Sequence, residues 1–452
     1  MSKEQVKRGS ETRLDTQPYN AGQVLIVGAG LGGLGAAIAL LLAGHNVTIL
    51  ESANEIGEIG AGIQVLPNSS KVLLHWGMRD LLEPYATKPR QVNMIGWKGN
   101  FISSMDTRES AAKYPGTFYW DFHRANLHKC LVERTLQLGG RLQCKSRATN
   151  VIVEGNGETA TVILSDGRMM SADLVIGADG INSRLREVML GKKDPPTRTG
   201  DLAYRLLLST KEMLKDPELA PLVTDPQVNY WLGPDAHAVN YVLRGGELFN
   251  MVLLVPDDMP AEGASTLAGN VEEMRALYKD WDPRIPKLLL LCEQVDKWRL
   301  CIRKGMDSWS HPSGSFCLLG DAVHATLPYL ASGAGMSFED AAVLGECLSR
   351  ITSKSPAAKR HALQIYEECR KGRTEMIVER GNRQQYLYHL HDGPEQQERD
   401  FMMRAVPTPP GEALAWRDPG LAPKLLGYDH LKDVDEHWRP LDRGPGREEA
   451  RL

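Results

Sequence analysis

The sequence predicts an α/β fold: a Rossmann-like domain that is interrupted by an inserted antiparallel sheet and followed by C-terminal helices. Three observations predict it. A βαβ pattern with a glycine-rich turn opens the chain, a series of strand-like segments begins after residue 199, and a buried strand with a glycine-rich helix start follows near residue 316. Ligands of open α/β sheets bind at the carboxyl ends of the strands, so the residues at those ends are the first to inspect.

The composition excludes several classes of protein. The chain has 452 residues, of which 42% are hydrophobic and 24% charged, and its net charge of -4 includes no basic block, so we expect no nucleic-acid partner. No apolar run reaches the roughly 18 residues that a transmembrane segment needs. The polar residues 1–17 lack the apolar stretch of a secretory signal. We expect a cytoplasmic protein, or a peroxisomal one if Ala450-Arg451-Leu452 is a functional import tripeptide.

The seven cysteines are scattered and form no C-x-x-C pair. An odd, dispersed set predicts free thiols instead of a disulfide framework, a zinc site or a dithiol redox centre. We therefore expect no metal site.

The first element is a βαβ unit with a dinucleotide fingerprint. Residues Gln23–Val27 and Asn46–Leu50 predict strands, and the apolar spacing from Leu34 predicts the helix between them. The turn before that helix carries a G-x-G-x-x-G pattern formed by Gly28, Gly30 and Gly33. This context favours a bound dinucleotide over a glycine-rich turn without a ligand, but it does not separate NAD from FAD.

Each fingerprint residue has its own physical role. Gly28 permits the tight turn, Gly30 lets the backbone approach a pyrophosphate at the helix N-terminus, and Gly33 lets the helix pack close to the strand. Glu51, at the end of the second strand, can accept hydrogen bonds from an adenosine ribose. Its carboxylate would repel a 2′-phosphate, which argues against NADP at this site.

The later elements suggest four parts. Strand-like segments with turn signals between them cover residues 202–208, 227–232, 236–243 and 248–255, and a long helix is expected from Ala357 to about Gln385. We divide the chain into the first part of a dinucleotide-binding domain at 22–198, a substrate-binding sheet at 199–305, the second part with C-terminal helices at 306–400, and a tail at 401–452. The residues from Pro407 on, rich in proline and charge, are expected to be loosely ordered.

Two further motifs each deliver an acidic residue after an apolar strand. Residues 173–180 read D-L-V-I-G-A-D-G and carry Asp179, and residues 316–340 contain G-D followed by P-Y-L-A-S-G-A-G-M and carry Asp321. Both motifs would lie at the edge of the sheet where ligands bind.

Together these motifs resemble the group A FAD-dependent aromatic monooxygenases, the salicylate-hydroxylase-like branch in particular. The resemblance covers residues 24–400 and includes H-D-G-P at 391–394. It implies that FAD is the bound cofactor, that NADPH or NADH is a transient reductant, and that O2 and a small aromatic molecule are substrates. It also implies that Asp321 and Arg124 contact FAD, that Asp179 helps to bind the flavin, and that the loop containing Gly62 lines it.

The helix start after Pro328 has a physical argument of its own. Backbone N–H groups at a helix N-terminus stabilise negative charge, and such charge develops on a flavin as it is reduced. The residues that could face the flavin in this way are Gly333, Ala334, Gly335 and Met336. The alternative is an ordinary glycine-rich helix start.

The chain contains one dinucleotide fingerprint, so a nicotinamide reductant would have to bind transiently in a shared cleft. The resemblance implies a single-component cycle: NAD(P)H reduces FAD, O2 adds to form a C4a-hydroperoxide, and the distal oxygen is transferred to an aromatic ring. The cofactor supplies this chemistry, and the protein supplies orientation and a dry pocket.

Three residues of the inserted sheet are candidates for catalysis. His237 and Tyr241 lie four apart on one strand and therefore face the same side, in an H-x-x-x-Y similar to that of salicylate- and hydroxynicotinate-type hydroxylases. A histidine there could accept a phenolic proton. Arg205 could bind a substrate carboxylate or phenolate, or donate to the hydroperoxide. The alternatives are a sheet histidine, a core tyrosine and an edge-strand arginine in water.

The sequence therefore predicts a monooxygenase that hydroxylates a phenolic or carboxylated aromatic substrate, with or without decarboxylation. One alternative keeps the flavin chemistry and changes the substrate to an indole or another natural product, which would be hydroxylated or epoxidised. The other is a non-catalytic flavin-binding protein. The substrate, the choice of NADH or NADPH and the oligomeric state stay open.

Overall fold

The computed structural model describes residues 22–57, 60–411 and 415–439. A five-stranded parallel sheet forms the first layer, and its central strand is the predicted first strand of the chain. The order across this sheet is β18 (Phe316–Leu318), β11 (Leu174–Gly177), β1 (Gln23–Val27), β2 (Asn46–Leu50) and β7 (Arg141–Gln143). The expected Rossmann-like arrangement is confirmed.

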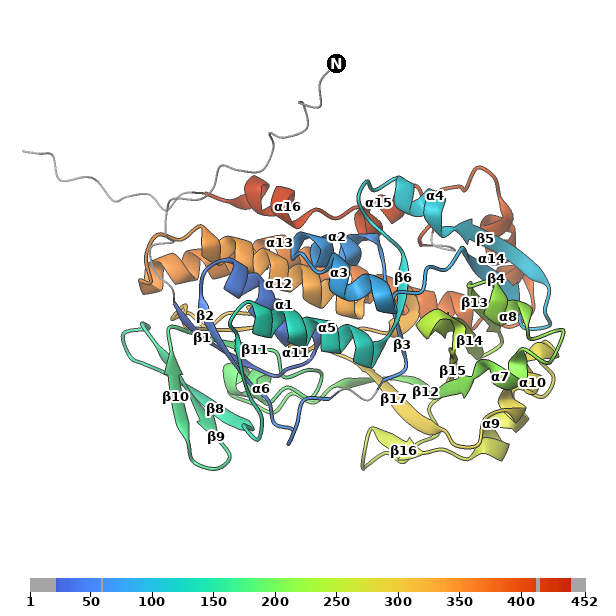
Figure 1. Cartoon of the computed structure of the whole chain (residues 1–452), viewed down its shortest axis with the longest axis horizontal. Coiled ribbons are helices and arrows are strands. Elements are labelled where there is room, and N and C mark those ends of the chain that lie inside the picture. The colour runs from blue at the N-terminus through green and yellow to red at the C-terminus, as the bar shows by residue number, and fades with distance from the viewer. Residues whose placement is uncertain (1–21, 58–59, 412–414, 440–452) are drawn as a thin grey trace, which may run out of the picture.

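Helices cover this sheet because they are apolar on the sides that face it. Helix α1 (Leu31–Leu42) is buried over most of its length and packs on α12 (Gly333–Ser349). Helix α13 (Pro356–Tyr388) runs along α12, as Figure 1 shows in orange. The hydroxyl of Ser355 caps α13 by accepting from the Ala358 N–H at 3.3 Å, and this cap fixes the start of the helix next to the expected residue.

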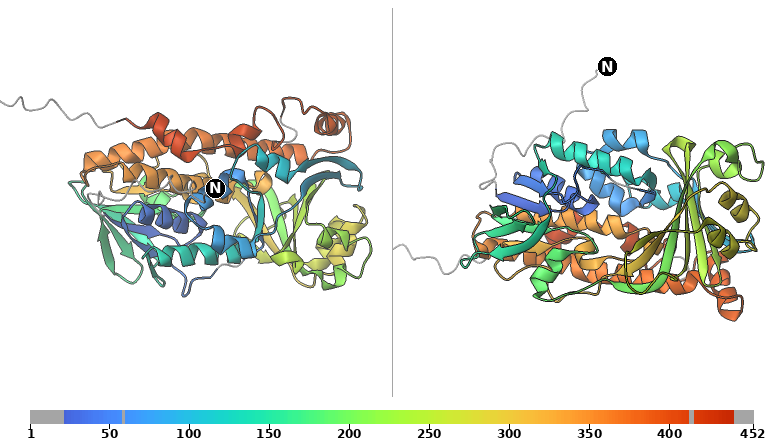
Figure 2. Two further views of the ribbon diagram at one scale, coloured as in Figure 1. Left: turned by 45° about the horizontal axis from the view of Figure 1, so that its top comes forward. Right: turned by 90° about the horizontal axis from the view of Figure 1, so that it is seen from below.

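The inserted segment forms most of a large, mainly antiparallel sheet of eight strands. Figure 2 shows this sheet at one end of an elongated molecule. Its order is β16 (Thr266–Ala268), β17 (Asp296–Ile302), β12 (Thr197–Ser209), β15 (Leu248–Pro256), β14 (Ala236–Leu243), β13 (Val228–Gly233), β4 (Gln91–Gly96) and β5 (Phe101–Asp106). Strands β4 and β5 come from the first part of the chain, and β13 pairs with β4 in parallel.

Smaller elements connect these layers. A three-stranded sheet contains β8 (Ala148–Val153), β9 (Ala160–Leu164) and β10 (Met169–Ala172), and a two-stranded ribbon contains β3 (Gly62–Val65) and β6 (Trp120–His123). The remaining helices and turns before α12 are α2 (Pro67–His75), α3 (Arg79–Leu82), η1 (Glu83–Tyr85), α4 (Thr107–Ala112), α5 (Arg124–Gln137), α6 (Arg184–Leu190), α7 (Thr210–Met213), α8 (Pro221–Thr224), η2 (Arg244–Gly246), α9 (Val271–Leu277), α10 (Arg284–Leu290), α11 (Asp321–His324) and η3 (Pro328–Leu330). None of the helices in the described ranges is long and apolar enough to cross a membrane.

The expectation of loose order after Pro407 is wrong for much of that segment. After α14 (Pro394–Arg404), the chain forms α15 (Ala422–Leu426) and α16 (His430–His437). Helix α16 packs on α12 and α13, and its Val434 is fully buried. The tripeptide at 450–452 lies outside the described residues. The division into domains at residues 198, 305 and 400 stays a prediction.

Candidate active site

A continuous cleft lies where the two large sheets meet. Strand β1 pairs with β2 on one side and with β11 on the other, and the chain runs from β1 to β2. The carboxyl end of β1 is therefore a topological switch point, which is the usual place for a ligand in such sheets. The cleft has an empty volume of about 1530 Å³. Loops after β1, β11 and β18 line one wall, and the eight-stranded sheet lines the other.

The glycine-rich turn is shaped as a cradle. A β-carbon on Gly28 would lie 2.4 Å from the Ala178 carbonyl oxygen, and one on Gly33 would lie 2.0 Å from the Gly28 carbonyl oxygen. Gly28 also has a φ of +108°, which favours glycine. By contrast, a β-carbon on Gly30 would have no neighbour within 4 Å, and Gly30 lines the cleft. Close backbone packing therefore requires glycine at positions 28 and 33, whereas Gly30 leaves space for a ligand.

Glu51 braces this turn from the neighbouring strand end. Its Oε2 accepts from the Ala29 N–H at 2.9 Å, and its Oε1 accepts from the Ala53 N–H at 2.8 Å. Burial opposes ionisation, but these hydrogen bonds hold the pKa of the Glu51 carboxyl below its usual value. Glu51 is thus a carboxylate at neutral pH, as a ribose-binding residue must be, although it is not among the residues that line the cleft.

The four residues at the glycine-rich start of α12 lie in two different environments. Gly333 and Ala334 line the cleft with the first turn of the helix. Gly335 faces α2 instead, because a β-carbon there would lie 2.3 Å from the Ser69 hydroxyl oxygen, and Met336 is buried. The helix N-terminus therefore faces the cleft, as expected, but only half of the predicted quartet forms the wall.

The acidic residues after β11 and β18 also differ. Asp321 lines the cleft with Arg124 and Pro328 and is exposed to it. Asp179 does not line the cleft. Its carboxylate accepts from the Ser183 hydroxyl at 2.5 Å and the Leu185 N–H at 3.0 Å, so it holds the start of α6. Burial raises the pKa of Asp179.

One face of the large sheet forms the opposite wall. The register aligns Arg205 on β12 with Val252 on β15 and Val239 on β14. His237 and Tyr241 lie two residues to either side of Val239, so all these side chains share a face. The cleft is lined by Ala203, Arg205, Tyr230, His237, Val239, Tyr241, Val252 and Leu254 from this sheet. The three predicted catalytic candidates are thereby brought together in one cleft with the glycine-rich turn.

Arg205 is a cation on the wall of the cleft. Its guanidinium stacks over the Trp298 ring at 4.5 Å, and none of the carboxylates in the described ranges forms an ion pair with it. Burial lowers the pKa of Arg205, and the nearby charge of Arg124 adds to this effect. Stacking orients the guanidinium but leaves its N–H donors for a ligand.

His237 and Tyr241 both stay neutral. Burial lowers the pKa of His237 well below its usual value, and the neighbouring His389 contributes. Burial raises the pKa of Tyr241 well above its usual value. Tyr241 also contacts the predicted flavin loop: a β-carbon on Gly62 would lie 2.3 Å from the Tyr241 ring, and the Gly62 N–H donates to Asn250 Oδ1 at 2.7 Å.

Comparison with known proteins agrees with this geometry. The FAD binding domain family matches residues 21–381. The FAD-dependent monooxygenase OpS4 of Beauveria bassiana is 39% identical over 91% of this chain and 96% of its own length. This chain belongs to the group A FAD-dependent aromatic monooxygenases. The cofactor is therefore FAD, and the open backbone at Gly30, the α12 N-terminus and the size of the cleft fit it.

Two further proteins extend the likeness. The 3-amino-4-hydroxybenzoate 2-monooxygenase of Streptomyces cremeus is 33% identical over 87% of this chain and 94% of its own length. The structure of a salicylate hydroxylase substrate complex superposes with a TM-score of 0.76. It is 21% identical, over 93% of this chain and 98% of that one. At that identity the superposition shows the fold alone. The family membership excludes the non-catalytic alternative.

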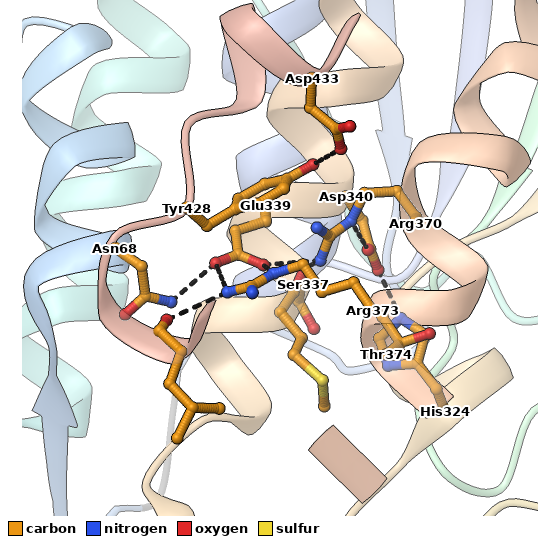
Figure 3. Close-up of polar contacts among 12 residues, drawn as sticks. Asn68, His324, Ser337, Glu339, Asp340, Arg370, Arg373, Thr374, Tyr428 and Asp433 are labelled. Carbon is orange, nitrogen blue, oxygen red and sulfur yellow. Dashed lines mark hydrogen bonds and ion pairs between the residues drawn. The ribbon is translucent and has the colours of Figure 1, made fainter. Parts of the chain in front are cut away.

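In this monooxygenase a buried ion network, which sequence reasoning did not identify, joins α12 and α13 (Figure 3). Glu339 and Asp340 on α12 are both fully buried and bind Arg370 on α13, at 2.7 and 2.8 Å. Asp340 also contacts His324 at 2.6 Å and accepts from the Gly320 N–H at 3.2 Å. The network thus joins α12 and α13 to α11, the short helix that carries Asp321.

A second missed feature is a pair of histidines. His237 Nδ1 lies 2.7 Å from Nε2 of His389, which stands just after α13. The two residues are 152 positions apart, and no motif or spacing in the sequence links them. His391 of the quoted H-D-G-P motif lies outside this pair and contacts Asp235 at 2.9 Å.

Proposed function

We propose that this monooxygenase hydroxylates a phenol that also carries a carboxylate, with or without decarboxylation. The observation that carries the proposal is Arg205, a cation on the cleft wall without a carboxylate partner among the described residues. Arg205 is partly buried, and a partly desolvated charge without a partner is unfavourable, so a ligand carboxylate would compensate it through paired hydrogen bonds. The name of the Streptomyces cremeus relative, a 3-amino-4-hydroxybenzoate 2-monooxygenase, supports this class of substrate.

His237 and Tyr241 have different roles toward the aromatic ring of the substrate. A neutral histidine is a proton acceptor, and His237 uses Nδ1 for His389, so Nε2 is the nitrogen left for the phenolic proton. Removing that proton makes the ring more electron-rich. Tyr241 keeps its own proton and can donate a hydrogen bond to the substrate.

The cofactor and the walls complete the proposal. When bound, FAD, reduced by NADPH or NADH, supplies the electrophilic oxygen that comes from O2. The N–H groups at the start of α12, which lines the cleft, would favour negative charge on the bound cofactor. The side chains of Val239, Val252 and Leu254 keep the reacting ring away from water.

The test is a screen of small aromatics with the FAD-loaded enzyme. Substrate-stimulated oxidation of NADH and NADPH would be followed with the mass of each product, and each phenolic acid would be paired with the phenol that lacks the carboxylate. We expect the acids to be preferred by about 10- to 100-fold in kcat/KM, with a gain of one oxygen. A loss of carbon dioxide together with that gain identifies the decarboxylative reaction. Preference for the uncharged phenols would contradict the proposal.

One observation favours the second candidate, hydroxylation or epoxidation of an indole or another natural product. The wall around His237 is aromatic: its ring lies 4.8 Å from that of Tyr329 and 6.5 Å from that of Tyr230. Such rings suit a flat uncharged ligand. Efficient turnover of an indole that is insensitive to Arg205→Met would select this alternative.

The location in the cell stays as expected from the sequence: cytoplasmic, or peroxisomal if the last three residues act as an import signal. A fluorescent fusion at the N-terminus, with and without residues 450–452, separates the two. Peroxisomal fluorescence that is lost with the tripeptide selects the second.

A further inference from the structure

The His237–His389 pair joins two separate depressions. His237 lines the active-site cleft, whereas His389 lines an outer depression with an empty volume of about 990 Å³. Neither histidine lines both. The outer depression is also lined by Asp235, Gln385, Tyr386, Leu390, His391 and Asp392. The pair is thus a polar contact between the enclosed reaction site and a surface hollow.

Several contacts hold His389 in place. Its carbonyl oxygen accepts from the Asp235 N–H at 3.1 Å, so its backbone is fixed to the turn before β14. Its Nδ1 lies 3.7 Å from Oδ2 of Asp201. The hydroxyl of Tyr329 donates to that same carboxylate oxygen, so Asp201 is held as well. The path from the cleft to the outer depression is therefore His237 and then His389, and the buried Asp201 lies beside His389.

We propose that His389 relays the phenolic proton from His237 to the outer depression. The substrate O–H bond breaks as its proton binds Nε2 of His237. The proton on Nδ1 of His237 then passes to Nε2 of His389 across the 2.7 Å contact. His389 becomes an imidazolium beside the Asp201 carboxylate and then releases a proton to solvent in the depression that it lines. One proton enters and one leaves, and no electrons are exchanged. This relay rests on the proposed function, because it needs a phenolic substrate.

The surroundings explain why a relay is needed. A buried neutral base that accepts a proton becomes an unpaired buried cation, which is costly. His237 is 1% exposed, and its ring contacts are aromatic, so it cannot hand the proton directly to water. The titratable groups that face the pair from the packed elements are Asp201 on β12, Tyr230 on β13, Asp235 in the turn before β14, Tyr278 after α9, Tyr329 on η3 and Tyr388 on α13.

Charge placement favours the outward direction. Burial lowers the pKa of His389, but the carboxylates of Asp201 and Asp235 raise it in opposition. His237 has no carboxylate in that role, and the charge of His389 lowers its pKa further. A proton shared by the pair is therefore more stable on His389, next to the carboxylates. His389 acts through His237, so it is a positioning and relay residue and not a catalytic one.

The test uses the FAD-loaded enzyme and 4-hydroxy-3-nitrobenzoate, whose phenolate absorbs visible light. Enzyme and probe are mixed rapidly at a pH below the pKa of the free phenol, in weak buffer with a pH indicator. Two rates are recorded, phenolate formation and proton release. His389→Gln keeps the shape and polarity but cannot carry the proton, and His389→Ala opens a space to the outer depression. His391→Ala, in the same hollow but without contact to His237, is the matched control.

In the wild type we expect phenolate formation and proton release to occur together. Both should slow by about 100-fold in His389→Gln and in His389→Ala, and added imidazole should restore the rate in His389→Ala alone. A purely structural role would not respond to imidazole. Unchanged flavin absorbance and an unchanged affinity for the probe show that each variant keeps its fold.

The outcomes separate the relay from the proposed function. If the wild type and His391→Ala ionise the probe, His237→Gln does not, and the His389 variants match the wild type, the relay is wrong and the proposed function stands. A wild type that binds the probe without ionising it, or does not bind it, overturns both. Rescue of His389→Gln by imidazole to the same extent as His389→Ala would also contradict the relay.

Discussion

Two charged regions of this molecule, the buried network of α12 and α13 and the wall of the cleft, differ in how their charges are compensated. In the network, Glu339 and Asp340 are fully buried, and each is bound by Arg370 within 2.8 Å. In the cleft, Arg205 has a ring as its neighbour but no carboxylate among the described residues. In the first region, opposite charges pair with one another and hold α11, α12 and α13 together. The second leaves a cation for a ligand.

Structural and functional charges can be distinguished within this one protein. Burying a charge costs free energy in either region. A charge that no neighbouring group of the protein compensates is therefore a candidate for ligand binding. The carboxyls of Glu339 and Asp340 keep their pKa values below the usual range despite burial, because Arg373, Arg370 and His324 lie beside them. At Arg205, burial and the charge of Arg124 lower the pKa, and the smaller effect of Tyr241 opposes them.

The largest expected effect comes from breaking the buried network. Arg370→Met removes the partner shared by Glu339 and Asp340 and leaves buried carboxylates with fewer partners. We expect the free energy of unfolding of the FAD-loaded protein to fall by about 3–5 kcal/mol, measured by chemical denaturation. Lys215→Ala, which breaks an exposed pair with Glu212, should leave the midpoint unchanged. Equal, small effects of both changes would show that the network is not structural.

The same substitution in the cleft should act on binding instead of on folding. Arg205→Met removes an unpaired cation, so the free energy of unfolding should stay within about 1 kcal/mol of the wild type. The affinity for 3-amino-4-hydroxybenzoate should fall by about 10- to 100-fold, since a charged hydrogen bond is lost. The affinity for 2-aminophenol, which lacks the carboxylate, should not change. Flavin absorbance titrations measure both affinities, and an equal loss for the two ligands would refute the assignment.

A smaller effect concerns His430, which begins α16 near the network. Burial, with the charge of His75 in addition, lowers the pKa of His430 to about 4. In the unfolded protein the pKa of His430 is about 6.5. Between this pH and about pH 4 the unfolded state binds more protons than the folded state, so the free energy of unfolding decreases as the pH falls. The expected loss from this residue at pH 5 is about 2 kcal/mol. His430→Phe should flatten the stability profile between pH 8 and pH 5 by that amount, and an unchanged slope would contradict the assignment.

Local patterns in the sequence predicted the elements whose formation is local. The βαβ unit, the inserted strands and helix α13 follow from apolar periodicity, turn residues and a serine–proline cap. Strands β4 and β5 could not be assigned to the large sheet, because β4 pairs in parallel with β13, far along the chain. Helix α16 was missed because tertiary packing of Val434, and not the propensity of a short helix, stabilises it.

The same division holds for the site. Strand periodicity, with the family resemblance, selected Arg205, His237 and Tyr241, and all three line the cleft. Their roles stay predictions. His389 and Asp201 could not be found in this way, because the contact of His389 with His237 joins the end of a helix to a strand 152 positions away. Polar networks between distant segments leave no periodic trace in a sequence.

A crystal structure of the FAD-loaded enzyme with 3-amino-4-hydroxybenzoate would test most directly the claim that Arg205 and His237 are left for a ligand. We expect the carboxylate within hydrogen-bond distance of the Arg205 guanidinium, and the phenolic oxygen against Nε2 of His237. A ligand bound with its carboxylate away from Arg205, or flavin atoms bonded to that guanidinium in its place, would contradict the account.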